Sequence, residues 1–462
     1  MTTLTQAINS ESTTTENGMP TYASSLNDLV DLFFSIGAMR GKNVIPAFSK
    51  AYASDGDLAT RIALWARDVR GGAGERKIYR DILSYMVDKD VTTARKMISK
   101  TVEIGRWDDL FVLFGTTLER DVLRAVSTAL KAGDSLCAKW CPRQGKDANK
   151  IRSYMKMTPK EYRKLLVGLT NVVETKMCAK DWDNIDFGKL PSLASSRYQT
   201  AFGRNAPAKY TAYKDSLEKG EAKINAGAVY PYDVIKSVRF GDKKVADAQW
   251  KALPNYLEGS KENIMPVVDV SGSMHCPAGG NNNVQCIDVA VSLGLYLCER
   301  SEGIFKDTFV TFSQQPMLQS VKGSLSDRVV QMNNSDWGMS TNLEAVFSLI
   351  LDAAVKHKVD PKEMPTMLLI LSDMQFNIGV KNPTDKSFDM IERMYANAGY
   401  KRPSIVYWNL NSKNGVPVTF NTQGTGLISG FSPAIMASVL KCDNLNPETL
   451  MLETIMNDRY KI

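Results

Sequence analysis

Histidine is almost absent from this sequence, since His275 and His357 are the only two among 462 residues. Neither lies in a pattern that defines a general acid–base pair. The seven cysteines are an odd number without regular spacing, which argues against a disulfide framework. Cys137 and Cys141 can share one helix face, but no second Cys or His pair accompanies them, so a structural zinc site is not indicated. A reducing, cytoplasmic compartment is the simplest interpretation.

Long apolar runs are also absent. No window approaches the ~18 uninterrupted apolar residues of a membrane-spanning helix, so we expect no membrane partner. Residues 1–20 lack the basic and then apolar order of a secretory signal and are instead rich in Thr, Ser, Asn and Glu. We expect residues 1–24 to form a disordered polar tail.

Charge is divided unevenly between the two halves of the chain. Residues 1–250 carry 39 Lys and Arg against 29 Asp and Glu, a formal charge of +10, whereas residues 251–462 carry 18 against 21, a charge of −3. A basic half attracts anionic partners through long-range attraction and counterion release, although many basic surfaces are simply solvated. Charge alone leaves a nucleic-acid partner and a solvated surface equally open.

Length and periodicity indicate more than one domain. A chain of 462 residues exceeds the size at which one hydrophobic core keeps growing. Residues 25–260 have apolar positions at three- and four-residue spacings, interrupted by short Gly or polar joints, which predicts an all-α domain compatible with an irregular solenoid. In residues 261–430, short apolar runs alternate with helical stretches, which predicts an α/β domain with a parallel sheet. Residues 431–462 are expected to add a C-terminal helical segment.

Oxygen-bearing residues follow the apolar runs of the α/β half. Asp269, Ser271 and Ser273 occupy alternate positions in "VVDVSGSMHC", so an extended backbone points all three side chains into one cavity. Thr341 precedes a helix, Asp373 ends the run "LLILSD", and open parallel sheets bind ligands at the carboxyl ends of their strands. Such oxygens suit a hard divalent cation, Mg²⁺ first, with Mn²⁺ or Ca²⁺ as alternatives. For the first three residues alone, a helix cap and turn serines are the simpler account.

A nucleophilic serine is another interpretation of the same stretch. Ser271 or Ser273 would need a base within hydrogen-bond reach, and His275 is only two residues beyond Ser273. The segment is not the G-x-S-x-G elbow of hydrolases, and no group that would orient His275 is evident. We therefore do not expect an enzyme.

The five oxygen-bearing residues resemble a known motif. Asp269-Val-Ser271-Gly-Ser273, followed by Thr341 and Asp373, is similar to the metal-ion-dependent adhesion site of von Willebrand factor A domains. The resemblance covers about residues 261–430 and implies a Rossmann-like α/β fold. It implies that the two serines and the threonine coordinate the cation directly or through water, while the two aspartates act largely through water and hydrogen bonds. One coordination position would remain open for an acidic group of a protein partner.

The helical half contains the stretches "LWARDVRGGAGERKIYRDIL", "IGRWDDLFVLF" and "NVVETKMCAKDWDNIDFGKLPSLASSRYQTAFGRN". These stretches resemble the TROVE module of Ro ribonucleoproteins and their TROVE-like relatives. The resemblance implies HEAT-like helices closed into a ring that binds noncoding or misfolded RNA with single-stranded ends. It also implies a protein that is monomeric within a ribonucleoprotein.

Basic residues interleaved with aromatic rings support RNA binding independently of that resemblance. Cations neutralise phosphates, and rings such as Tyr154 and Tyr162 can stack on unpaired bases. The alternative is that these rings belong to the helix core. The residues expected to contact RNA are Lys139, Arg143, Lys146, Lys150, Arg152, Lys156, Arg163, Lys164, Arg197, Arg204 and Lys209.

The glycine-rich stretch "RGGAGERK", residues 70–77, does not indicate a nucleotide site. It lacks the Gly-Lys-Ser/Thr ending of a P-loop and follows a helix rather than a strand. We interpret Gly71, Gly72 and Gly74 as a tight joint between two helices.

Two functions stay open at this point. The first is a non-enzymatic RNA-binding ribonucleoprotein scaffold with a metal-dependent adhesion site. The second is a protein-interaction module that recruits an acidic partner through the bound cation, with the basic half incidental.

Overall fold

The computed structural model describes residues 12–278, 284–312, 315–335, 341–377 and 387–462, and for residues 239, 240 and 387 it describes the backbone alone. The chain divides into two compact units. The α/β unit comprises the described residues up to Ile62, Tyr230–Lys243 and Leu253–Asn457. The helical unit comprises Ala63–Val229, Lys244–Ala252 and Asp458–Ile462. A helical region and an α/β region are therefore both present, as predicted, but each is assembled from separate stretches of chain.

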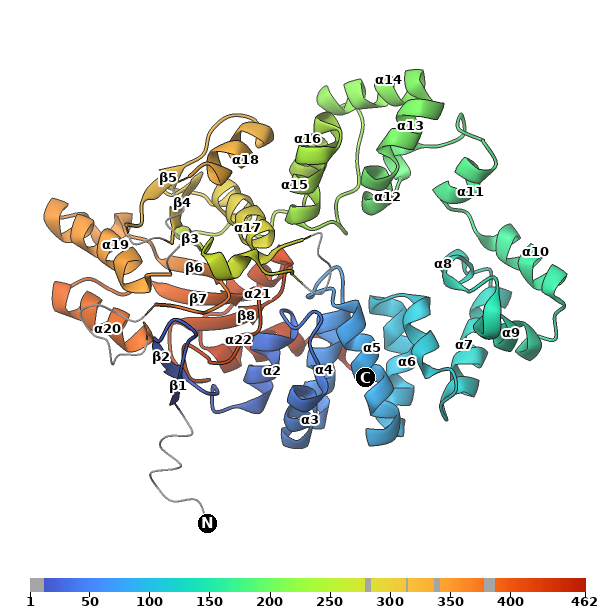
Figure 1. The fold of residues 1–462 in the computed structure, drawn as a ribbon, viewed down its shortest axis with the longest axis horizontal. Coiled ribbons are helices and arrows are strands. Elements are labelled where there is room, and N and C mark those ends of the chain that lie inside the picture. The colour runs from blue at the N-terminus through green and yellow to red at the C-terminus, as the bar shows by residue number, and fades with distance from the viewer. Residues whose placement is uncertain (1–11, 279–283, 313–314, 336–340, 378–386) are drawn as a thin grey trace, which may run out of the picture. The chain divides into compact units, whose positions relative to one another are not determined.

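The α/β unit is built on a six-stranded sheet with the order β5-β4-β3-β6-β7-β8 (Figure 1). All neighbouring strands are parallel except β4 and β5. The chain runs outward from β3 to β5 on one side and from β6 to β8 on the other, so the strand order reverses between β3 and β6. The strands are β3 (Ile264–Val268), β4 (Thr308–Thr311), β5 (Leu318–Ser320), β6 (Met367–Ser372), β7 (Ser404–Asn409) and β8 (Thr425–Ser429).

Burial explains why the inner strands read as continuous apolar runs. Every residue of the inner strands β3 and β6 is buried, as expected for a parallel sheet covered by other elements on both faces, and the edge strand β8 is buried as well. The helices of this unit are α2 (Asp28–Ile36), α3 (Ile45–Ser54), α15 (Pro231–Phe240), α17 (Cys286–Arg300), α18 (Leu325–Asn333), α19 (Leu343–His357), α20 (Ser387–Ala398), α21 (Met436–Val439) and α22 (Pro447–Ile455).

Helix α2 belongs to the α/β unit, although its sequence lies in the predicted helical stretch 25–260. Its buried face includes Phe33 and Phe34, and the helix packs against β8. The hydroxyl of Ser429 donates to the backbone oxygen of Phe33 at 2.8 Å, and the side-chain amide of Asn409 donates to that of Phe34 at 3.1 Å. Helix α15 likewise packs against α17. Periodicity predicts these helices correctly, but it carries no information on which surface their apolar faces cover.

Part of the predicted disordered tail, residues 1–24, is ordered. Strands β1 (Ser12–Thr14) and β2 (Pro20–Tyr22) form an antiparallel hairpin. The hydroxyl of Thr15 donates to the backbone oxygen of Phe376 at 2.6 Å, and the backbone of Tyr22 exchanges hydrogen bonds with that of Val416. The hairpin therefore adds to the carboxyl end of the sheet through hydrogen bonds that a polar composition does not reveal.

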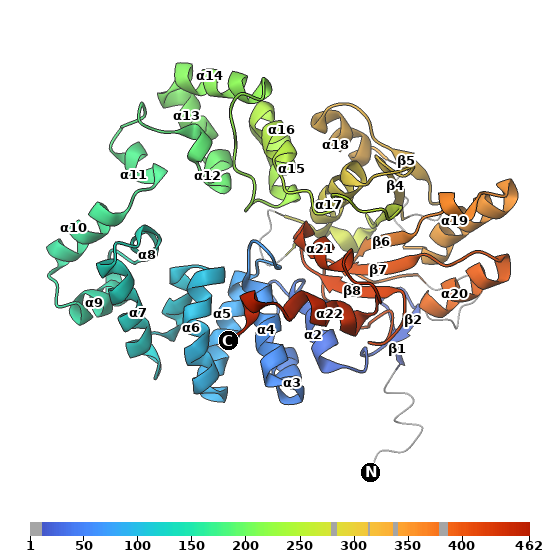
Figure 2. The ribbon, with the colours of Figure 1, turned by 180° about the vertical axis from the view of Figure 1, so that it is seen from behind.

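In the helical unit, several successive helices contact one another, first within residues 76–169 and again within residues 192–218, as in a solenoid (Figure 2). The helices and turns of this unit are α4 (Gly56–Arg67, which begins in the α/β unit), α5 (Arg76–Lys89), α6 (Val91–Ile104), the 3₁₀ turn η1 (Trp107–Leu113), α7 (Glu119–Lys131), α8 (Ser135–Trp140), α9 (Gly145–Tyr154), α10 (Pro159–Leu169), α11 (Val173–Cys178), the turn η2 (Phe187–Lys189), α12 (Ser192–Arg197), α13 (Gln199–Asn205), α14 (Pro207–Glu218) and α16 (Lys243–Lys251). No helix among the residues that the structure describes is long and apolar enough to cross a membrane.

The joint between α4 and α5 depends on close backbone contact. A Cβ at Gly72 would lie 1.9 Å from the backbone oxygen of Trp65, which is far inside van der Waals contact. The next residue, Ala73, donates its backbone N–H to the same oxygen at 3.2 Å. Only glycine fits at this position. The glycine-rich stretch therefore forms a tight turn at the end of α4 and is not a phosphate-binding loop.

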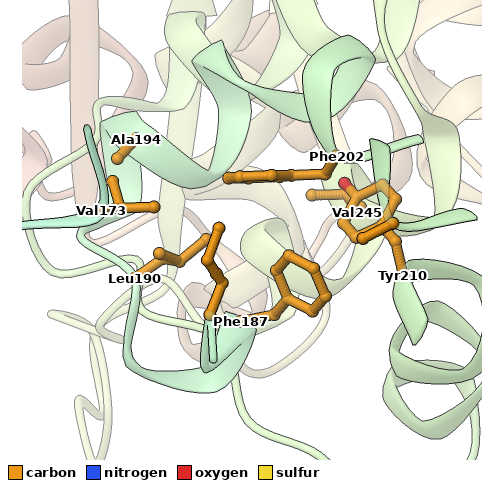
Figure 3. Packing of buried hydrophobic residues seen from close by; sticks show 9 residues of the cluster. Val173, Phe187, Leu190, Ala194, Phe202, Tyr210 and Val245 are labelled. Carbon is orange, nitrogen blue, oxygen red and sulfur yellow. The ribbon is translucent and has the colours of Figure 1, made fainter. Parts of the chain in front are cut away.

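Aromatic side chains form the core of the second half of the helical unit (Figure 3). Phe187 from η2 lies at its centre, with ring centroids 5.1 Å from those of Phe202 and Tyr210. Val173, Leu190 and neighbouring apolar residues close the cluster. Phe202 and Tyr210, which stand among basic residues in the sequence, are thus core residues.

The last five residues complete the helical unit. The guanidinium of Arg459 forms a bidentate ion pair with the carboxylate of Asp68, and the Tyr460 hydroxyl donates to the same carboxylate at 3.1 Å. Asp68 is fully buried, so these contacts supply the partners that a buried charge requires. The predicted C-terminal segment 431–462 is therefore split, with α21 and α22 on the α/β unit and the last turn on the helical unit.

Candidate cation site and nucleic-acid interface

Two buried carboxylates stand on either side of the point where the strand order reverses. Asp269 follows β3 and Asp373 follows β6, and the two strands are paired in parallel register, with Val268 opposite Leu371. Asp269 is 0% and Asp373 is 1% exposed. Crevices at such reversal points are where open α/β sheets bind ligands.

The loop after β3 is organised by hydrogen bonds to Asp269. The Ser271 backbone N–H donates to Asp269 Oδ1 at 2.9 Å, and the Ser372 hydroxyl donates to Asp269 Oδ2 at 2.5 Å. The Oγ atoms of Ser271 and Ser273 lie 3.0 Å apart. Three of the predicted ligands are thus brought together, while Ser372 is a positioning residue that the sequence interpretation missed, although it directly precedes Asp373.

Thr341 reaches the same edge through the loop after β6. Its backbone oxygen accepts a hydrogen bond from the N–H of Asn377 at 2.9 Å. Thr341 is 1% exposed, and its Oγ1 has no hydrogen-bond partner among the residues that the structure describes. A buried hydroxyl without a partner is costly, and a cation or its water would supply one.

The electrostatics of the two carboxylates favour a cation. Burial, and next the charge of Asp373, raise the pKa of Asp269 to about 6. No group of three or more His, Cys, Asp or Glu with metal-binding geometry occurs within the described ranges. A cation here would depend on two carboxylates and three hydroxyls, a set that suits a hard, partly hydrated ion such as Mg²⁺. These oxygen donors fit a divalent cation. The residues that would hold it are Asp269, Ser271, Ser273, Thr341 and Asp373.

A lysine that sequence patterns did not reveal lies at this edge. Lys413 Nζ is 3.1 Å from Asp373 Oδ2 and 2.5 Å from Glu16 Oε2, which comes from the N-terminal hairpin. The ammonium therefore neutralises part of the charge that a divalent cation would meet. Neither residue stands in a motif, and their proximity depends on the hairpin.

An exposed basic surface extends from the residues just before α9, through the turn that follows α9, to α10, and five of its six members are predicted RNA contacts, the sixth being Lys160. Its members are exposed, and among described residues none makes an ion pair. We call this set the α9–α10 basic surface: Arg143, Lys146, Lys156, Lys160, Arg163 and Lys164. Lys160, Arg163 and Lys164 share one face of α10, opposite the buried Tyr162 and Leu166.

Other predicted contacts serve the fold. Lys150 pairs with Glu119 at 2.5 Å, and Lys139 lies 4.0 Å from Glu174. Lys209 donates to the backbone oxygens of residues 183 and 185 at 2.5 and 2.7 Å. Arg152 donates to the side chain of Asn149 at 3.0 Å. Arg197 and Arg204 are exposed but lie on α12 and α13, outside the α9–α10 basic surface.

The aromatic residues near this surface divide between core and surface. Tyr162 is 1% exposed and donates its hydroxyl to the backbone oxygen of Pro142 at 3.2 Å, so it is a core residue. Tyr154, at the end of α9, is 38% exposed. Tyr154 is thus the ring of this series that remains available for stacking.

The helical unit and the α/β unit are together similar in fold to a solved Ro protein. The chain matches the crystal structure of the Deinococcus radiodurans Ro (RSR) protein with a TM-score of 0.51 and 13% sequence identity, over 93% of this chain and 100% of that chain. The predicted resemblance to Ro proteins is therefore confirmed at the level of the fold. The assignment of the α/β unit to von Willebrand factor A domains stays a prediction.

Sequence comparison defines the family more closely. Two family models match, each described as a domain of unknown function, DUF2828 at residues 15–104 and 143–261 and DUF7788 at residues 263–460. The chain belongs to the family of the uncharacterized protein L728 of Acanthamoeba polyphaga mimivirus, to which it is 30% identical over 96% of this chain and 86% of that protein.

Proposed function

We propose that this protein is a non-enzymatic RNA-binding scaffold that contacts RNA through its helical unit. The α9–α10 basic surface carries the proposal, because its six cations are exposed while Ala148, Ile151 and Tyr162, which lie between them in the sequence, are buried. Exposed cations neutralise phosphates and release counterions, and Tyr154 offers a face for an unpaired base. The Ro-like fold supports the proposal. Noncoding or misfolded RNA with a single-stranded end is the class of ligand proposed, bound by a monomer in the cytoplasm.

Direct binding with mapped crosslinks tests this function. Full-length protein is titrated with a single-stranded oligonucleotide and with a hairpin that carries a free 3′ end, over a series of salt concentrations. We expect affinity to fall steeply with salt, and ultraviolet crosslinks to fall on residues 143–164. Crosslinks confined to the α/β unit, or no binding at low salt, would contradict the proposal.

For the α/β unit we propose a divalent-cation site of the adhesion type, with one position open to an acidic group of a protein partner. The buried carboxylate pair carries this second proposal, together with the Thr341 hydroxyl, which has no hydrogen-bond partner among the described residues. When bound, Mg²⁺ would supply positive charge to the partner's carboxylate. Asp269 and Asp373 would orient the hydroxyls and hold the hydration shell.

Removal of the metal separates the two activities. Chelation, or Asp269→Ala, is expected to abolish Mg²⁺ binding and capture of an acidic protein, while RNA affinity stays unchanged. If RNA affinity also falls with the metal in a folded variant, the two sites are not independent and the proposed division is wrong. Capture of an acidic protein without any RNA binding would favour the protein-interaction module instead.

The positions of Ser271 and Ser273 support the non-enzymatic assignment. Their hydroxyls hydrogen-bond to each other, and His275 is exposed on the turn that follows. Nothing in that arrangement activates either serine as a nucleophile, which would require a hydrogen-bonded base.

A further inference from the structure

Two cysteine thiols meet beside the loop that carries Ser271 and Ser273. Cys276 follows the 3₁₀ turn η3 (Gly272–His275), and Cys286 begins α17. Their Sγ atoms lie 3.5 Å apart. Because the pair lies next to the candidate cation site but outside its proposed ligand set, it has no role in the functions proposed above.

The backbone places the two cysteines directly opposite each other. Pro277 and Gln285 form an antiparallel bridge, and the N–H of Cys286 donates to the backbone oxygen of Cys276 at 3.1 Å. Opposite residues in an antiparallel pair have Cα atoms about 4.5–5.5 Å apart, within the range of about 4.4–6.8 Å that a disulfide requires. A bond between the two sulfurs needs side-chain rotation rather than backbone movement.

The two thiols differ in the way that a nucleophile and a resolving thiol differ. Cys276 is partly exposed, whereas Cys286 is 1% exposed. The side-chain amide of Asn411 donates to Cys276 Sγ at 3.2 Å, which stabilises a thiolate. A hydrogen bond with Cys286 is the main cause that lowers the pKa of Cys276 to about 7, while the same contact and burial raise the pKa of Cys286. Solvent-borne reagents thus reach the more acidic thiol first.

A second pair in the chain shows what is distinctive here. Cys137 and Cys141 have Sγ atoms 3.9 Å apart, but both are buried, at 0% and 2% exposed. The hydrogen bond with Cys141, and next burial, raise the pKa of Cys137. The two thiols of this pair are close together but are not accessible to solvent, so the pair serves as an internal control.

We propose that Cys276 and Cys286 form a reversible thiol–disulfide pair that is oxidised by two-electron oxidants of the peroxide class. The Cys276 thiolate attacks a peroxide oxygen, the O–O bond breaks, and Cys276 sulfenic acid and one water form once a proton is taken up. The Cys286 sulfur, losing its proton, then attacks the Cys276 sulfur and expels hydroxide, which leaves as the second water. Two thiols and one hydrogen peroxide thus give one disulfide and two waters. The bond ties the loop that bears Ser273 to the start of α17.

Thiol counting in one tryptic peptide tests the proposal. Residues 262–300 contain no internal Lys or Arg and hold Cys276, Cys286 and Cys298. Full-length protein is treated with a small excess of hydrogen peroxide, denatured, alkylated with iodoacetamide and digested. We expect three alkyl groups on this peptide before oxidation and one, at Cys298, afterwards. Dithiothreitol is expected to restore all three.

Two single variants distinguish the roles of the sulfurs. In Cys286→Ser the sulfenic acid at Cys276 has no resolving thiol, so labelling by dimedone at Cys276 is expected to increase. In Cys276→Ser, Cys286 should remain alkylatable after oxidation. Peptides 132–139 and 140–143, which hold Cys137 and Cys141, should stay unlinked.

The reference for reactivity is Cys178, which is exposed and has no thiol neighbour in the described chain. Cys276 is expected to react with peroxide at least about tenfold faster than Cys178, because the side-chain amide of Asn411 stabilises its thiolate. Three alkylatable thiols in peptide 262–300 after Cys178 has been oxidised would overturn the proposal. So would a disulfide that forms equally fast between Cys137 and Cys141.

Discussion

The two units of this molecule differ more in charge than the two halves of its sequence. The segments of the helical unit carry 35 Lys and Arg against 22 Asp and Glu, a formal charge of +13, whereas those of the α/β unit carry 22 against 28, a charge of −6. The corresponding values for residues 1–250 and 251–462 are +10 and −3. Folding therefore sorts the charge further. Residues 1–62, with a formal charge of −2, join the acidic unit, whereas Lys251 and residues 458–462, with +2 between them, join the basic unit.

This sorting has a physical consequence for binding. An anionic ligand is attracted to one unit and repelled by the other, so opposite charges in one chain favour one class of ligand on each. RNA suits the basic unit, and a cation followed by its acidic partner suits the other. Four variants test this division, from the largest expected effect to the smallest.

Gly72→Ala is expected to unfold the helical unit selectively. The new Cβ would meet the Trp65 oxygen at 1.9 Å, so the joint between α4 and α5 must open. Hydrogen exchange read by mass spectrometry should show protection lost over residues 63–229 and kept in β3 and β6. Gly168→Ala is the matched control, because its Cβ meets nothing within 4 Å on helix α10, and we expect a gain of about 0.5–1 kcal/mol there. Equal behaviour of the two variants would contradict the role assigned to Gly72.

Arg163→Glu combined with Lys164→Glu is expected to weaken RNA binding about 100-fold at moderate salt. Two cations then no longer neutralise phosphates. The plot of log association constant against log salt concentration should therefore become less steep, by about 1.4 for a single strand. Fluorescence anisotropy over a salt series measures both values. The control reverses the same number of charges on the acidic unit, at the exposed Lys356 and Lys362. An unchanged slope in the first variant, or an equal loss of affinity in the control, would remove the α9–α10 basic surface from the interface.

Arg459→Met is expected to destabilise the helical unit by about 2 kcal/mol, because it leaves the buried carboxylate of Asp68 short of its main partner. Burial raises the pKa of Asp68. The hydrogen bond and the charge of Arg459 lower it by more than burial raises it, so the pKa of Asp68 lies below its ordinary value. The pair therefore contributes stability at neutral pH and loses it as the pH falls below about 4.

Urea unfolding followed by hydrogen exchange measures this change. Arg124→Met is the control, since Arg124 pairs with Asp121 at the surface, where its side chain is 66% exposed. We expect less than about 0.5 kcal/mol for that variant. A comparable effect of both substitutions would mean that Asp68 does not depend on its pair.

Lys413→Met is expected to tighten Mg²⁺ binding about tenfold, because the ammonium 3.1 Å from Asp373 both neutralises that carboxylate and repels a cation. Titration calorimetry on the full chain measures the affinity. Lys413→Arg keeps the charge and should bind like the unaltered protein. Weaker binding in the methionine variant would show that Lys413 supports the site rather than competes with the cation.

The inner strands of the α/β unit could be predicted, because each one corresponds to a short apolar run in the sequence. The runs "IMPVVDV", "TMLLILSD" and "SIVYWNL" became β3, β6 and β7, since strands buried on both faces need uninterrupted apolar residues. The edge strand β5 is short and partly exposed, so it carries no such signal. Strand β8, with Gly426 inside it, was also missed.

The candidate site was predictable only where residues follow strands. Asp269 and Asp373 could be placed because carboxyl ends of parallel strands share one edge of a sheet. Lys413 and Glu16 could not, because almost four hundred residues separate them and only the hairpin brings them together. Lys150 and Lys209 were predicted to contact RNA, but the sequence pattern does not reveal that Glu119 and the turn before η2 engage them.

The packing of α2 on β8 also bears on how the protein is made. Ser429, which binds the backbone of Phe33, lies 396 residues later in the chain. At about 5–20 residues per second, a ribosome takes roughly 20–80 s to supply it. During that time the apolar face of α2 has no strand to cover it. Synthesis of this chain is thus expected to depend on a chaperone that shields residues 28–36, and ribosome-bound intermediates that end before residue 425 should be its preferred clients.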